Sequence, residues 1–166
     1  MKHILPILTI TTLAAAASAQ TAAASSGLSY NRVGLSYDTQ TTKGYSLSAS
    51  ALVGGNVLVS AETTIGGDHG NGADTVSVGY VFKGVAYGID AALSIGSNEA
   101  YGLNLRKDLG SNLEAAVSYS REQGNNVWGV EVQYNLNKQF GIALGYADSN
   151  AAGVSSQTTV SVRYNF

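Results

Sequence analysis

Apolar and polar residues alternate strictly along the last ten residues of this chain. One face carries Val160, Val162, Tyr164 and Phe166, and the other carries Ser161, Arg163 and Asn165. A period of two is typical of a β-strand whose faces meet different environments. The pattern therefore predicts a strand over residues 157–166 with one apolar and one polar face.

The same alternation recurs in four longer segments, and each predicts a hairpin because Gly or Asn interrupts it near the middle. The segments are 44–66 (turning at 54–56), 74–96 (turning at Lys83–Gly84), 99–122 (turning at 109–112) and 127–148 (turning at 135–139). A further strand is expected over residues 28–38. The sum is about ten strands, with eight as the alternative, and an even number suits a closed antiparallel barrel.

Two places depart from this alternation. Leu28 and Tyr30 are out of phase with the apolar residues from position 33 onward. Either a β-bulge at residues 31–32 flips the phase, or the strand begins at Arg32 after an ordered lead-in. Leu52 and Leu58, beside the first hairpin turn, also fall on the polar face.

The N-terminus has the features of a secretory signal peptide. Lys2 and His3 precede a mostly apolar stretch over residues 4–17, and Ala17-Ser18-Ala19 forms an A-x-A-like cleavage site. This stretch is too short for a spanning helix. We therefore expect residues 1–19 to be a signal peptide and residues 20–166 to form one barrel domain.

Composition narrows the class of protein. Only 12% of the residues are charged, against about 25% in ordinary soluble domains. After the predicted signal peptide no apolar run is long enough for a spanning helix, so strands are the expected means of crossing a membrane. Cysteine is absent, and the formal net charge of −2 argues against a nucleic-acid partner.

The chain resembles the small bacterial outer-membrane β-barrels, the porin-like and opacity-type proteins. The signal peptide, the alternating strands and the terminal Tyr164-Asn165-Phe166 carry the resemblance. It implies an all-β, transmembrane, antiparallel up-and-down barrel in the bacterial outer membrane, with outer-membrane lipid around it. It also implies that Val162, Tyr164 and Phe166 form an assembly signal, which the barrel-assembly machinery reads.

The apolar face is expected to point outward, toward lipid. The polar face has too many Gly, Ala and Ser residues, and too few charges, for a good aqueous exterior. Aromatic residues gather near the strand ends, as expected at the two interfaces of a membrane. The long-loop rim carries Tyr37, Tyr45, Tyr101, Trp128 and Tyr146, and the short-turn rim carries Phe82, Tyr87, Tyr134, Phe140, Tyr164 and Phe166.

With the apolar face outward, the charged residues of the strands face the lumen. They are Arg32, Glu62, Asp90, Arg106, Asp108, Glu114, Glu131 and Arg163. Buried charges need partners or water, so carboxylates near Arg106 and Arg163 are expected to form an ion-pair network. This network either fills the barrel interior or lines a narrow water path and sets its ion preference.

We expect no enzyme, no cofactor and no metal. A rim protease would need catalytic Asp and His residues, and Asp68, His69 and Asp148 offer no second Asp pair. The loop around His69 lacks the spacing of a calcium site. The sequence therefore favours a structural barrel or a narrow passive pore for small solutes or ions. The alternative is a surface adhesion protein that acts through its extracellular loops.

Overall fold

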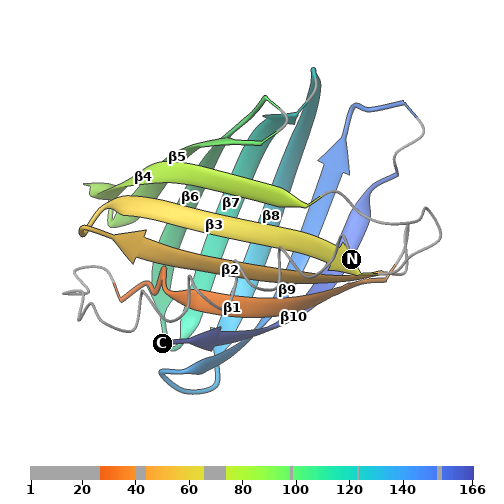
Figure 1. Ribbon diagram of the computed structural model, residues 1–166. Coiled ribbons are helices and arrows are strands. Elements are labelled where there is room, and N and C mark those ends of the chain that lie inside the picture. Colours follow the sequence, from red (N-terminus) through yellow and green to blue (C-terminus); the bar gives the residue numbers. More distant parts are fainter. Residues whose placement is uncertain (1–26, 40–43, 66–73, 98, 123, 153–154) are drawn as a thin grey trace.

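The computed structural model is a closed all-β barrel (Figure 1). It describes residues 27–39, 44–65, 74–97, 99–122, 124–152 and 155–166, so the predicted signal peptide lies outside the described residues. The ten strands are β1 (Arg32–Asp38), β2 (Tyr45–Val53), β3 (Val57–Ile65), β4 (Thr75–Ala86), β5 (Ile89–Gly96), β6 (Ala100–Gly110), β7 (Leu113–Glu122), β8 (Asn125–Asn135), β9 (Phe140–Ser149) and β10 (Gln157–Asn165). The prediction of ten strands is confirmed.

Each strand pairs with its neighbours in sequence, and β1 pairs with β10 to close the ring. All the pairings are antiparallel; in the closing pair, Leu35 lies opposite Val162 and Ser36 opposite Ser161. Closure leaves no unpaired edge, so the backbone groups of the strands are satisfied without water. Figure 1 shows the C-terminus on the side of the short turns, next to the start of β1.

The beginning of β1 settles the question of its phase. The ladders of β1 with β10 and with β2 both begin at Arg32, with no bulge. Leu28 and Tyr30 therefore belong to an ordered lead-in that precedes the strand. Of the two alternatives for this region, the lead-in is confirmed.

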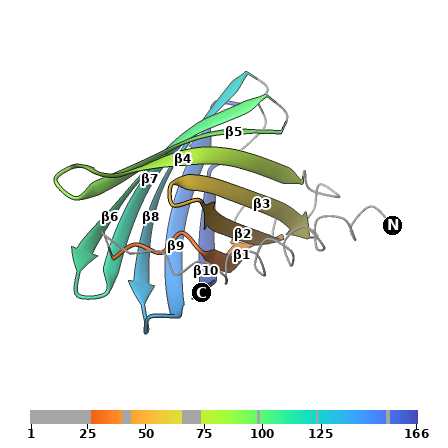
Figure 2. The same ribbon diagram turned by 60° about the vertical axis from the view of Figure 1, so that its left-hand side comes forward.

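Three of the four hairpin turns lie where the sequence predicts them, and the turn between β4 and β5 does not. It lies at Tyr87–Gly88, where φ is 53° and 73°, and not at Lys83–Gly84. Gly84 also has a positive φ of 61°, but it forms part of an irregularity between Phe82 and Ala86. Its amide donates to Asp90 Oδ1 at 2.8 Å. A glycine that makes a bulge was therefore mistaken for the turn itself, and the β4–β5 hairpin extends past the β2–β3 turn (Figure 2).

The outward direction of the apolar face is confirmed. Large apolar side chains alternate along the strands and remain exposed, among them Leu35, Val78, Leu93, Val130, Leu144 and Val162. Neighbouring aromatic rings pair on this surface, with Tyr37 and Tyr45 at 5.0 Å and Phe140 and Tyr164 at 5.2 Å. No helix in the described ranges has the length and hydropathy that a membrane span requires.

Candidate functional site

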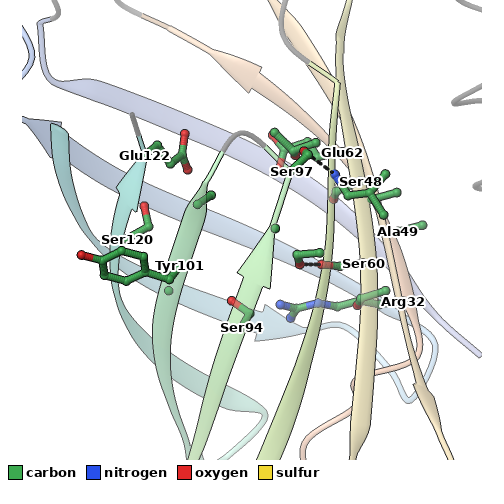
Figure 3. Close-up of a pocket in the computed structure, with 18 of the residues that line it drawn as sticks. Arg32, Ser48, Ala49, Ser60, Glu62, Ser94, Ser97, Tyr101, Ser120 and Glu122 are labelled. Atoms are coloured by element: carbon green, nitrogen blue, oxygen red, sulfur yellow. Dashed lines mark hydrogen bonds between the residues drawn. The ribbon is translucent and has the colours of Figure 1, made fainter. Parts of the chain in front are cut away.

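The lumen contains a cavity of about 350 Å³ whose wall is rich in serine (Figure 3). The serines come from β2 to β5, from the residue after β5 and from β7: Ser48, Ser50, Ser60, Ser77, Ser94, Ser97 and Ser120. The hydroxyls of Ser60 and Ser77 are bonded at 2.6 Å across the β3–β4 pair. Hydroxyl groups are small and both donate and accept, so this wall suits water or a hydrophilic solute.

Four charged residues line this larger cavity: Arg32, Glu62, Glu122 and Arg163. Glu62 and Glu122 lie near the ends of β3 and β7 that lead into the long loops. Arg32 is the first residue of β1 and therefore lies farther from the long-loop rim. Figure 3 shows it away from the two carboxylates. The cavity therefore has carboxylates toward the long-loop rim and a guanidinium deeper in the lumen.

A second cavity of about 210 Å³ lies against β6 to β10. Its wall also includes Arg32 and Arg163, together with Asn104, Ser118 and Glu131. Since both cavities share the two arginines, these side chains form the boundary between them. The arginines therefore lie where the two described cavities adjoin.

Two of the three lumenal arginines have close carboxylate partners. Arg106 Nε donates to Glu114 Oε1 at 2.6 Å, and both side chains are almost completely buried. Arg163 holds Glu131 through both of its terminal nitrogens, and its Nη1 also donates to Gln133 Oε1 at 2.7 Å. The bidentate geometry fixes the Arg163 guanidinium against the wall formed by β8.

Arg32 is less closely matched. Its Nη1 lies 4.0 Å from Glu114 Oε1, which Arg106 already contacts at 2.6 Å. The side chain of Arg32 is 24% exposed, against 3% for Arg106. Of the three arginines, Arg32 is thus the one that depends most on lumenal water for solvation.

The lead-in fills the short-turn end of the lumen. Leu28 and Tyr30 are 6% and 5% exposed, and they pack with Leu52, Val81 and Ala92 in one buried apolar cluster, which Leu58 also contacts. The two leucines that interrupt the polar face, Leu52 and Leu58, are therefore explained: they face inward and meet the lead-in.

Tyr30 also makes polar contacts within this cluster. Its hydroxyl donates to Asp90 Oδ2 at 3.0 Å, and the Arg106 guanidinium lies 4.4 Å from the centre of its ring. Burial raises the pKa of the Tyr30 hydroxyl well above its ordinary value, so the group remains a donor at physiological pH. Tyr30 thereby joins the apolar cluster to the ion pair of Arg106 and Glu114.

The structure places seven of the eight sequence-predicted charges inside the barrel, in two groups. Arg32, Glu62 and Arg163 line the larger cavity, and Glu131 lines the smaller one. Asp90, Arg106 and Glu114 are almost completely buried toward the short-turn end. The eighth, Asp108, lines neither cavity: it is exposed near the β6–β7 turn and accepts from the Gly110 amide at 2.8 Å. At the C-terminus, the rings of Tyr164 and Phe166 stack at 6.4 Å, and Val162 is exposed on the outer face.

Sequence reasoning missed three contributors to the lumen: Glu122, Val81 and the lead-in itself. The phase of Glu122 was available from its strand. The lead-in had a signal as well, because Leu52 and Leu58 are apolar at inward positions and need an apolar partner. Asp68 and His69, considered for a rim protease, lie outside the described residues, and Asp148 accepts a hydrogen bond from the Ser149 amide at 2.9 Å.

Comparison with solved structures places this fold among the small outer-membrane porins. A KdgM porin matches with a TM-score of 0.52 at 16% identity, over 81% of this chain and 99% of that chain. A KdgM porin in complex with disordered oligogalacturonate gives 0.54 at the same identity and the same coverage. A NanC porin gives 0.48 at 16% identity, over 81% of this chain and 98% of that chain. No family model matches the sequence, and neither does any curated protein.

At this level of identity the likeness concerns the fold. The resemblance to small outer-membrane β-barrels, drawn from the alternating strands and the terminal aromatic residues, is confirmed. The fold is a closed all-β barrel with an exposed apolar exterior, and it is similar to the fold of these porins.

Proposed function

We propose that this protein is a narrow passive pore of the bacterial outer membrane. The observation that carries the proposal is the polar lumen: two hydrophilic cavities meet at Arg32 and Arg163 inside a closed barrel. A barrel that served only as an anchor would gain nothing from a hydrated interior. Charged side chains that line a lumen are a common means by which pores select ions.

The outer surface supports a membrane location. Exposed aromatic residues lie toward both rims, with Trp128 and Tyr146 at 5.6 Å at one and Phe140 and Tyr164 at 5.2 Å at the other. Such rings are favoured where lipid meets water. We propose outer-membrane lipid as the surrounding partner. We also propose that the barrel-assembly machinery reads Val162, Tyr164 and Phe166, after secretion through a signal peptide at residues 1–19.

The lumenal charges favour a channel over an enzyme. Arg106 and Arg163 are held by Glu114 and Glu131, whereas catalysis needs a nucleophile, a base and an orienting group around an open position. The adhesion alternative depends on loops that lie largely outside the described residues. No observation in the described part of the chain favours it over a pore.

The charge balance favours small cations and neutral hydrophilic solutes. Of the four charges on the larger cavity, Arg163 is bonded to Glu131, so Glu62 and Glu122 outnumber Arg32. Oligogalacturonate, the ligand of one similar porin, carries a carboxylate on each sugar. Glu62 and Glu122 would repel such a chain, so we do not extend that ligand to this protein.

The test is conductance in a planar bilayer. The mature chain is refolded in detergent, its barrel is verified by a heat-dependent gel shift, and single-channel currents are recorded. We expect discrete, reproducible steps. Ser60→Trp, on the cavity wall, should reduce the size of the current steps. Val59→Trp is the control, since Val59 is the adjacent residue of β3 and faces outward, and it should leave the steps unchanged. A folded barrel that never conducts would overturn the proposed pore.

A further inference from the structure

We infer that residues 27–31 form a plug that closes the short-turn end of the lumen and must leave it for solutes to pass. The inference deepens the proposed pore function and rests on it for the role in conduction. The closure itself stands on the packing of the lead-in.

The lead-in crosses the lumen rather than following one wall. Leu28 and Tyr30 pack with residues of three strands: Leu52 of β2, Val81 of β4 and Ala92 of β5. The Tyr30 hydroxyl is bonded to Asp90 of β5, and its ring is covered by Arg106 of β6. Contacts that reach from β2 to β6 require the segment to extend across the interior.

The start of the lead-in lies against β6 as well. Gly27 has φ of +73°, and a Cβ at this position would lie 2.5 Å from Asp108 Oδ2. Asp108 is two residues from the β6–β7 turn. The segment therefore begins beside the short-turn end of β6 and ends at β1. In the ring of ten strands, β1 lies opposite β6.

The remaining part of this end is filled by polar groups. Arg106 and Glu114 are bonded and buried there, and Gln133, only 2% exposed, accepts from Arg163 at 2.7 Å. The plug, Arg106, Glu114 and Gln133 together occupy a section of the lumen that neither described cavity reaches, since none of these residues lines either one. The larger cavity therefore runs from the carboxylates near the long-loop rim only as far as Arg32 and Arg163.

The plug lacks the two ladders that hold the strand that follows it. From Arg32 onward, β1 has ladder partners on both sides. Before Arg32, single hydrogen bonds replace the ladders. The Leu52 amide donates to Asn31 Oδ1 at 2.8 Å, the Phe166 amide to the Asn31 carbonyl at 3.1 Å, the Ser50 hydroxyl to the Tyr30 carbonyl at 2.8 Å, and Tyr30 to Asp90. Departure of the lead-in, with Arg32 as the hinge, would therefore break single hydrogen bonds and the apolar cluster but no strand pairing, so the barrel would stay closed.

The experiment uses the absence of native cysteine from the chain. Ala92→Cys places a thiol under the plug, and Ser94→Cys, two residues along the same strand, places one on the open cavity wall. Reaction of each thiol with a small cationic thiosulfonate is timed in refolded barrels. Each cysteine substitution is made in two chains, one with the native lead-in and one with the double substitution Leu28→Ser/Tyr30→Ser. Leu28→Met/Tyr30→Phe serves as the control that keeps the packing, and the heat-dependent gel shift verifies folding in every case.

In the native background, we expect the thiol of the Ala92→Cys variant to react at least tenfold more slowly than that of the Ser94→Cys variant. In the Leu28→Ser/Tyr30→Ser background, the Ala92→Cys rate should rise at least tenfold, and the Ser94→Cys rate should stay the same. In bilayers, the double serine variant should show open steps at least several times as often as the native chain. Equal thiol rates in the native background would overturn the plug, and so would an unchanged frequency of steps in a chain that does conduct.

The outcomes separate the plug from the pore. Protection of the Ala92→Cys thiol that is lost in the serine variant, with no current from either protein, would support the plug as a seal and overturn the proposed pore. Current from the native chain with an unprotected Ala92→Cys thiol would support the pore and overturn the plug.

Discussion

At the residue scale, the pair of Arg106 and Glu114 is the most buried charge interaction of the described lumen. The two side chains are 3% and 5% exposed, and the Arg106 guanidinium also faces the Tyr30 ring at 4.4 Å. Such a pair contributes little over an apolar replacement, but breaking it leaves a charge without a partner. Its removal should therefore be costly even though its presence adds little net stability.

Glu114→Gln should lower the free energy of unfolding by about 3–5 kcal/mol, because it leaves the Arg106 charge buried and uncompensated. Urea unfolding in lipid vesicles measures the change. Glu122→Gln is the matched control, since Glu122 is exposed and lines the larger cavity, and it should stay within about 0.5 kcal/mol of the native chain. Equal costs for the two variants would contradict the buried pair.

Val162 tests the assignment of the outer face. It is 54% exposed and lies between Leu35 of β1 and Ile142 of β9. Val162→Arg should cost about 2–4 kcal/mol of folding free energy if the residue lies near the middle of the membrane. Val162→Ala, which removes apolar area without adding charge, should cost clearly less. Both are compared by unfolding titration in vesicles, and a negligible cost for arginine would refute a lipid-facing position.

At the element scale, the strands could be predicted because alternation depends only on local sequence. The ten strands and three of the four hairpin turns follow from the period of two and from Gly and Asn at the turns. The prediction of the β4–β5 turn was wrong because Gly84 has a positive φ, as a turn residue would. The extra length of the β4–β5 hairpin goes with the contact of the Gly84 amide with Asp90. A local sequence pattern does not contain such a contact.

The lumen could be predicted only in part, for a similar reason. Period two places Arg106 and Glu114 on the same face, but their pairing depends on the register of β6 and β7. The lead-in is harder still, since Tyr30 meets Asp90, which is 60 residues away. The inward Leu52 and Leu58 show that the lumen is apolar at this point, yet they do not identify the segment that covers them.

The β4–β5 pair depends on a close approach at Gly79. A Cβ at this position would lie 2.5 Å from the Leu93 carbonyl oxygen and 3.1 Å from the Ser94 Cβ. Gly79→Ala must therefore displace backbone, and we expect a cost of about 1–3 kcal/mol. Gly102→Ala is the control, because its nearest contact is the movable Ser94 hydroxyl at 3.1 Å. Thermal unfolding, followed by gel shift, should give Gly79→Ala a lower unfolding temperature than Gly102→Ala. The reverse order would contradict the strand packing.

At the scale of the whole molecule, one sequence period produces two different surfaces. Outward positions carry large apolar side chains, and inward positions carry Gly, Ala, Ser and the charges. Because the ring of strands is closed, the outer surface fits lipid, and polar side chains line the cavities inside. The interior is divided in turn: its short-turn end is packed, and the described cavities lie beyond it, around Arg32 and Arg163.

The ion preference of the proposed pore would test the charges that line its cavities. Glu62 and Glu122 line the larger cavity together with Arg32, while Arg163 is bonded to Glu131. Carboxylates in excess attract cations and repel anions within a narrow lumen. The native pore should therefore pass potassium more readily than chloride.

Glu62→Gln/Glu122→Gln should abolish this preference or reverse it, because Arg32 is then the uncompensated charge on the cavity. Reversal potentials in a potassium chloride gradient measure the effect, and Arg32→Gln should shift them in the opposite direction. Lys107→Gln is the control, since Lys107 alternates with the lumenal Arg106 on β6 and so faces outward. An unchanged reversal potential in the double glutamine variant would mean that ions do not pass along this wall, and that the path lies with the smaller cavity and Glu131.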